Sequence, residues 1–277
     1  MKANQSVFNF PLSWVTGIYV LSLLLAIHQS TKYSDDSLLA TEAYQHVLVA
    51  SPSNSGATSV HLPVILDTHR SVPTNGLLLH YRFEGNSLDS SGFSNHGTNF
   101  GGISYTSGKV GLAARFDGIN DYVRSISPPI LGHLGSTFTI GFWLKPENYQ
   151  NGGVIDIGKE NRETWEISHR NQLTSYVQNW NRPQREIFPY TLPTPLNVWT
   201  YVTFVFDDNL FIAFVNGIEA ANYSFNYGPI IDGDEWIEVG VNAPGGDEYF
   251  KGQVDEVRIY GRALQDFEIQ ELFNEGN

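Results

Sequence analysis

The loop from Asp89 to Gly97, DSSGFSNHG, is rich in oxygen donors and small residues. Calcium takes about six to eight oxygen ligands from carboxylates, amides and main-chain carbonyls. Asp89 and Asn95 supply a carboxylate and an amide oxygen, so this loop is chemically suited to a calcium ion once a second carboxylate joins it. The alternative is a turn in which the Asp89 side chain accepts hydrogen bonds from nearby backbone amides, with Asp255 bonding other backbone amides.

A second group of residues combines aromatic and basic side chains in a polar stretch. The segment YVQNWNRPQR holds Tyr176, Trp180 and Arg182 within seven residues. A loop tryptophan beside arginine can stack on a sugar ring or anchor a protein contact. We therefore predict these three residues as a ligand-binding site. The alternative is that Trp180 folds back onto the core of the domain.

Carboxylate pairs suited to glycoside cleavage are missing from the predicted strands. Such enzymes hold two carboxyl groups about 5 Å apart when they retain configuration, which within one strand requires acids on the same face. Glu163 and Glu166, like Glu235 and Glu238, are three residues apart and therefore point to opposite faces. Asp234 shares a face with Glu238 but belongs to a turn. We predict that the protein is not an enzyme.

The overall charge and composition exclude other classes. The net charge is −13 at pH 7, and no cluster of Lys and Arg offers the phosphate contacts that nucleic-acid binding needs. The chain has no cysteine, which excludes disulfides and thiolate zinc sites. With 41% hydrophobic residues it has ample material for a packed core.

The N-terminal residues 1–30 contain an apolar segment. From Val7 to Ile27 there are 21 residues without charge, which as a helix would span roughly 31 Å, about one hydrocarbon thickness. We predict a retained signal anchor in the lipid bilayer, with a cytoplasmic N-terminus and the rest in the periplasm or at the cell surface. A cleaved signal peptide is the alternative. The predicted membrane-embedded residues include Trp14, Tyr19 and Leu23.

Residues 31–75 have the composition of a linker. Within them Ser34–Ala50 is predicted as a short helix, because Leu39, Ala43 and Val47 would share one face. Ser51–Asn75 contains three prolines and many Ser and Thr residues, which indicates an extended segment.

Residues 76–277 predict an all-β domain. Short apolar or alternating runs are separated by turn residues, which is typical of an antiparallel β-sandwich. Val198–Phe206 is apolar on both faces, and Asn216-Gly217 suits a tight hairpin turn. Trp143, Trp199 and Trp236 lie in such runs and are expected in the core. The predicted strands are Leu77–Phe83, Leu112–Asp117, Phe138–Lys145, Val154–Gly158, Leu173–Gln178, Val198–Phe206, Leu210–Val215, Trp236–Val241 and Gly252–Tyr260, and a short C-terminal helix is predicted at Leu264–Phe273.

Five motifs carry a resemblance to a known family: LHYRFEGNSLDSSG, ARFDGINDYV, FTIGFWLKP, WTYVTFVFDDN followed by FVNG, and above all GQVDEVRIYGRALQDFEIQELF. With them, residues 76–277 resemble a laminin-G-like jelly roll of the concanavalin A-like lectin/glucanase superfamily. The resemblance implies that the Asp89 loop lies beside the start of the last strand. Asp255 would then lie near Asp89, and the two would share a structural calcium ion with Asn95.

This fold hosts many functions, so the class of function must be argued from the other segments. An anchor, a linker and a sandwich without catalytic residues predict a membrane-tethered recognition or scaffold module. We expect an accessory subunit of a larger membrane complex, such as a respiratory, photosynthetic or secretion complex. The alternative is a lectin-like surface protein that binds glycan.

Overall fold

The computed structural model describes the backbone at 44–49 and 58–63, and then residues 71–125, 134, 136–159, 162–170, 172–178, 185–187, 189–224, 236–242 and 248–277. The chain divides into two compact units, Met1–His69 and Arg70–Asn277. The predicted anchor, including Trp14, Tyr19 and Leu23, lies outside these residues. Among the helices that are described, none has the length and apolar character to span a membrane.

The first unit contains a strand where a helix was predicted. β1 (Tyr44–Val49) pairs antiparallel with β2 (Thr58–Pro63). The helix predicted at Ser34–Ala50 is therefore wrong over the residues of β1. Val47 and Val49 are β-branched and favour extended backbone. The polar stretch that follows allows the chain to return and pair, and this pairing outweighs the weak helical periodicity.

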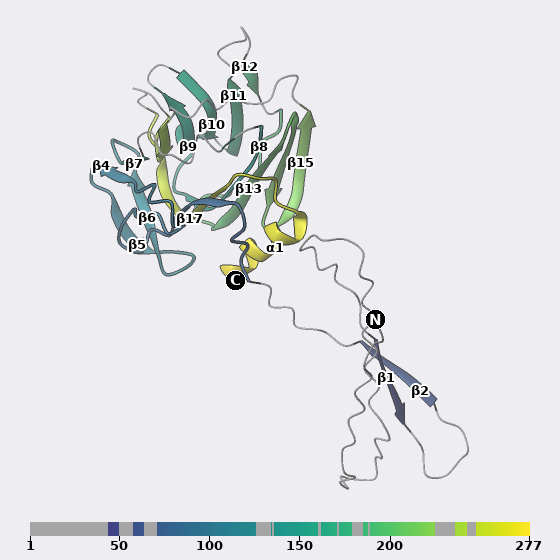
Figure 1. The fold of residues 1–277 in the computed structure, drawn as a ribbon. Helices are drawn as coiled ribbons and strands as arrows, with labels where there is room; N and C mark the ends of the chain where they lie inside the picture. The colour runs from purple at the N-terminus through teal and green to yellow at the C-terminus, as the bar shows by residue number, and fades with distance from the viewer. Residues whose placement is uncertain are drawn as a thin grey trace. The chain divides into compact units, whose positions relative to one another are not determined.

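The second unit is an antiparallel β-sandwich, as predicted (Figure 1). Its seven-stranded sheet has the order β12-β11-β10-β9-β16-β7-β4. In that order the strands are Arg185–Ile187, Gln172–Gln178, Arg162–Arg170, Gly152–Lys159, Trp236–Val239, Tyr122–Ser125 and Thr98–Phe100.

The eight-stranded sheet has the order β15-β14-β13-β8-β17-β6-β5, and β3 (Leu77–Tyr81) also pairs with β17. In that order the strands are Ile218–Ser224, Leu210–Val215, Thr200–Asp207, Thr137–Pro146, Lys251–Tyr260, Leu112–Asp117 and Ser104–Ser107. The domain's last strand, β17, thus lies inside the sheet and pairs with β3, β6 and β8.

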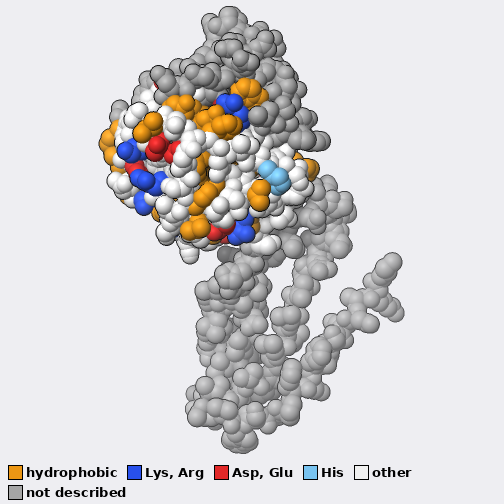
Figure 2. All heavy atoms as spheres, turned by 90° about the vertical axis from the view of Figure 1, so that its left-hand side faces the viewer, with side chains coloured by type: hydrophobic (Ala, Val, Ile, Leu, Met, Phe, Trp, Pro, Cys, Tyr) orange, Lys and Arg blue, Asp and Glu red, His pale blue; other side chains and the backbone are white. Residues whose placement is uncertain are grey.

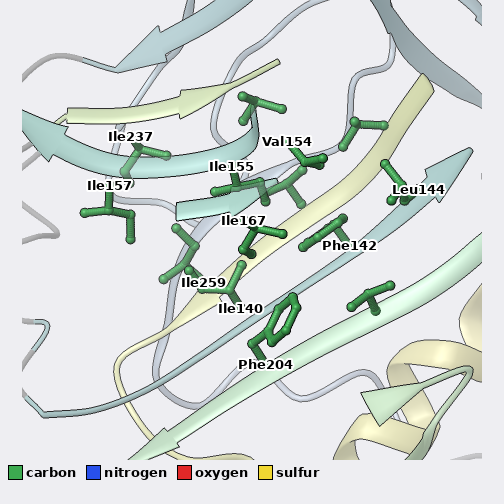
Figure 3. Packing of buried hydrophobic residues seen from close by; sticks show 14 of the residues in the cluster. Ile140, Phe142, Leu144, Val154, Ile155, Ile157, Ile167, Phe204, Ile237 and Ile259 are labelled. Carbon is green, nitrogen blue, oxygen red and sulfur yellow. The ribbon is translucent and has the colours of Figure 1, made fainter. Parts of the chain in front are cut away.

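The core lies between the two sheets, where alternate residues of each strand face inward (Figure 3). The eight-stranded sheet contributes Ile140, Phe142 and Phe204, all fully buried. Ile155 and Ile167 of the seven-stranded sheet pack against this layer. Apolar burial between the sheets therefore fixes which residues of each strand face outward.

The outer face of the eight-stranded sheet is apolar as well, because the helix α1 (Asp266–Glu275) covers it. Ile269 and Leu272 of α1 are buried in one cluster with Trp143 and Tyr201. The expectation of a core position for Trp143 is therefore confirmed. The other outer face of the sandwich, on the seven-stranded sheet, carries polar and aromatic side chains instead.

Candidate functional site

Asp89 and Asn95 lie together in the loop that was predicted to bind calcium. Asp89 Oδ1 accepts hydrogen bonds from the backbone N–H groups of His80 and Ser91, both at 2.9 Å. Its Oδ2 accepts from the Asn95 N–H at 3.0 Å and from the Ser91 hydroxyl at 2.8 Å. Asp89 therefore forms the turn that was weighed as the alternative to calcium, and it also ties the loop to β3.

Asp255 lies on β17 and is completely buried. Its Oδ2 accepts hydrogen bonds from the backbone N–H groups of Lys109 at 2.9 Å and Val110 at 3.0 Å. Burial raises the pKa of this carboxyl group to about 7. These donors differ from those of Asp89, so the hydrogen bonds of the two carboxylates form separate groups.

The predicted calcium ligands nevertheless retain unused oxygens. Asn95 Oδ1 and Asp255 Oδ1 are buried and have no hydrogen-bond partner, and such oxygens are suitable ligands for calcium. Within the described ranges no group of three or more histidine and acidic side chains is arranged to hold a metal. A site at Asp89, Asn95 and Asp255 would therefore depend on amide and main-chain oxygens too, and it stays a prediction.

The predicted ligand-binding residues fall largely outside the described structure. Trp180 and Arg182 are not among the described residues. Tyr176 is described by its backbone only, on β11, where it pairs with Glu166 of β10.

The seven-stranded sheet carries a row of charged residues across four of its strands. The row consists of Glu166, Asp156, Glu238 and Arg124, and each residue is the register partner of the next. The backbone of Tyr176 on β11 pairs with Glu166 at one end. Core residues flank these four charged residues along their strands, among them Ile167, Ile155, Ile237 and Val123, so the four side chains face outward. The three carboxylates of the row are buried.

Sequence reasoning missed this row because each acid lies on a different strand. A search for acids two or four residues apart examines one strand only. The register of two strand pairs, β10 with β9 and β9 with β16, brings Asp156, Glu166 and Glu238 together, and that register is a property of the folded sheet. The available signal was limited to single acids flanked by isoleucines or valines, as in VIDIG and WIEV.

One end of the row is surrounded by aromatic rings, and we call these rings the aromatic cluster: Phe100, Tyr122, Trp236 and Tyr249. The Arg124 guanidinium carbon lies 4.2 Å from the ring centre of Trp236, 5.2 Å from that of Tyr122 and 5.7 Å from that of Phe100. Phe100 and Tyr122 stack at 4.5 Å, and Tyr249 lies 6.4 Å from Tyr122.

The rings of the aromatic cluster are partly exposed. Trp236 was expected in the core, and this expectation is wrong. The next residue of β16, Ile237, is buried in the core, so Trp236 lies on the other, outer face of the sheet. Figure 2 shows the domain from the side on which β4 and β7 lie in Figure 1, where hydrophobic, basic and acidic side chains lie next to one another. The cluster thus presents aromatic surface to solvent beside a charged pair.

Glu238 forms that charged pair with Arg124. Arg124 Nε donates to Glu238 Oε1 at 2.5 Å, and Nη2 contacts the same oxygen. Glu238 is fully buried and its Oε2 has no hydrogen-bond partner. Burial raises the pKa of Glu238, and the Arg124 charge partly opposes this change.

Two antiparallel sheets packed face to face, with a helix over one outer face, define a jelly roll of the lectin-like class. The comparison with protein families agrees with this geometry. The chain belongs to the concanavalin A-like lectin/glucanases superfamily, since the Laminin_G_3 family model matches residues 117–270. No curated protein matches the chain.

Solved structures share the fold. Domain 4 of AbnA, a GH43 extracellular arabinanase from Geobacillus stearothermophilus, solved in complex with arabinotriose, is 25% identical with a TM-score of 0.59. The match covers 71% of this chain and 97% of that domain.

Toxin binding domains are also similar. The binding domain of Paraclostridial Mosquitocidal Protein 1 has a TM-score of 0.61 at 18% identity, over 73% of this chain. That of botulinum neurotoxin DC, solved in complex with SialylT, has a TM-score of 0.58 at 18% identity, over 74% of this chain. This chain spans about half, 52%, of each of these toxin chains.

Proposed function

We propose that the domain at residues 76–277 binds glycans without cleaving them, through the aromatic cluster around Arg124. The observation that carries this proposal is the group of partly exposed rings beside a charged pair on the outer face of the seven-stranded sheet. Aromatic faces pack against the C–H surface of sugar rings, and the neighbouring polar groups bond their hydroxyls.

The similar structures support a sugar as the ligand. The arabinanase domain was solved with arabinotriose, and one of the toxin domains was solved with SialylT. The match covers nearly the full length of the arabinanase domain, so the likeness extends over a whole domain. Arabinotriose is therefore the first probe to test.

Binding without cleavage follows from the burial of the acids. Asp156 and Glu238 are fully buried and Glu166 nearly so, whereas a glycosidase needs its acid and its nucleophile or base in contact with the sugar. We expect no release of reducing sugar from arabinan.

The predicted accessory-subunit role and the membrane anchor stay predictions. They depend on segments outside the described residues, and nothing within the described ranges favours one membrane complex over another. Glycan binding is compatible with a tethered domain at the cell surface.

Substitution of Trp236 tests the proposed site. We expect Trp236→Ala to weaken arabinotriose binding by about 1–2 kcal/mol through the lost ring contact. Isothermal titration calorimetry measures the change directly. Trp199→Ala is the matched control, since Trp199 is also partly exposed but packs with the cluster under α1.

The result separates two surfaces. Equal affinities of wild type and Trp236→Ala would remove the aromatic cluster as the site. Loss of binding in Trp180→Ala alone would instead assign the ligand to the predicted loop of Tyr176, Trp180 and Arg182. Absence of binding to every glycan on an array would contradict the proposed function.

A further inference from the structure

Arg124 is the basic group of the aromatic cluster, and its guanidinium lies within about 6 Å of the ring centres of Trp236, Tyr122 and Phe100. Its Nε and Nη2 are both directed to Glu238 Oε1. No hydrogen bond of Nη1 is found in the described residues, and 20% of the side chain is exposed. A guanidinium has five N–H groups in a rigid fork, so Arg124 can still donate to a ligand.

Glu238 places a negative charge against this guanidinium. The Glu238 side chain has no exposed surface, whereas part of the Arg124 side chain is exposed. A ligand can therefore reach the guanidinium but not the carboxylate. Charge-assisted hydrogen bonds of this kind are short and strong. The pair therefore offers N–H donors without a net charge.

We propose that Glu238 is a specificity-determining residue: by neutralising Arg124, it makes the aromatic cluster a site for uncharged sugars. The inference rests on the proposed glycan-binding function and names the ligand class of the same site. A hydroxyl of a neutral sugar accepts from Arg124 Nη1 while the sugar ring packs against Trp236 or Tyr122.

The two opposite charges of the pair disfavour acidic sugars and basic sugars alike. A uronic or sialic acid carboxylate bound at Arg124 would lie close to Glu238 and would approach a chain with a net charge of −13. A protonated amino sugar would lie against Arg124 itself. Only an uncharged sugar is repelled neither by Glu238 nor by Arg124.

The variant Glu238→Gln tests this inference, with arabinotriose as the neutral probe and trigalacturonic acid as the acidic one. Glutamine keeps the carbonyl oxygen that accepts from Arg124 but leaves the guanidinium charge uncompensated. We expect wild type to bind arabinotriose and not trigalacturonic acid. In Glu238→Gln we expect affinity for trigalacturonic acid to rise about tenfold, and this gain to disappear in high salt.

Glu219→Gln is the matched control, because it makes the same change in total charge at an exposed position of β15. We expect it to bind both probes as wild type does. If Glu238→Gln does not fold, Glu238→Met replaces it, because methionine has a similar shape and no charge. It also removes the carboxylate that contacts Arg124, so we expect the same gain in affinity for trigalacturonic acid.

Each outcome separates the two claims. Binding of arabinotriose with no gain of acidic binding in Glu238→Gln would overturn the role of Glu238 and leave the glycan-binding function in place. Equal gains in Glu238→Gln and Glu219→Gln would overturn it too, because total charge would then be the cause. If wild type binds neither probe nor any other neutral glycan, both the function and the inference fail.

Discussion

At the scale of single residues, Asp255 and Asn95 each carry a buried oxygen without a hydrogen-bond partner. A buried polar atom left without a partner costs about 1–3 kcal/mol, so two such oxygens among the three predicted calcium ligands need an explanation. A calcium ion shared with Asp89 would supply one. A turn stabilised by Asp89 alone leaves both oxygens unexplained.

The first prediction concerns this ion. Addition of a chelator should lower the melting temperature of the wild type, because a ligand bound only to the folded state stabilises it by about 2.7 kcal/mol at a hundred times its Kd. Asp255→Asn should abolish this response. Differential scanning calorimetry with calcium and with chelator measures both.

Asp208→Asn is the control for that substitution, since Asp208 is exposed and bonds Ser136. It should respond to chelator as wild type does. A wild type indifferent to both chelator and added calcium would rule out the calcium site.

Among the structural elements, the strands that are apolar on both faces were predicted well from the sequence. The strand predicted at Leu210–Val215 is found with the same bounds as β14, and Val198–Phe206 is found as β13. The hairpin turn at Asn216-Gly217 is confirmed, because both residues have positive φ, 52° and 77°. Such strands have one arrangement that buries them, so local pattern is enough.

Strands with a polar outer face were missed. β10, RETWEISHR, has few apolar residues, and β7, YVRS, and β4, TNF, are short. These strands carry parts of the candidate site: Glu166, Arg124 with Tyr122, and Phe100. Their pairing depends on strands that are distant in the sequence, so the residue pattern of one strand does not predict it.

The second prediction concerns β10. His169 is buried between the rings of Tyr149 and Phe250, with centroids at 6.4 and 6.3 Å. Burial lowers its pKa, partly opposed by the Thr194 backbone. The unfolded chain therefore binds the proton more readily, and stability is lost as pH falls from the ordinary histidine pKa of about 6.5 toward the lower folded value.

Substitution of His169 by Leu should remove this contribution. As the pH falls from about 7.5 to about 5, a range that brackets the ordinary histidine pKa of about 6.5, we expect the urea midpoint of the wild type to decrease. The midpoint of His169→Leu should decrease less steeply. Parallel pH profiles for the two proteins would show that folding does not lower the pKa of His169.

At the scale of the whole molecule, the third prediction concerns the N-terminal segment. If residues 1–30 form an anchor and the protein is an accessory subunit, gentle solubilisation of native membranes should yield a large particle that contains it. Fractionation by size tests this. Migration as a single chain of 31.0 kDa with bound detergent would contradict the subunit role.

The same experiment tests the anchor itself. Recovery of the protein from membranes only with detergent supports a membrane span, whereas release by high salt or alkaline carbonate would contradict it. The described helices do not bear on this question, because residues 1–30 lie outside them. The anchor was predicted from composition, which reports apolarity but not the structure that the segment adopts.

The position of β17 has a consequence for biosynthesis. This strand pairs with β3, β6 and β8 inside one sheet, and α1, which follows it, seals that sheet's outer face. While the ribosome still holds these residues, the earlier strands lack their central partner and expose apolar surface. We therefore expect the domain to fold only after β17 and α1 have left the ribosome, so that nascent chains depend on chaperones and chains terminated before β17 are degraded.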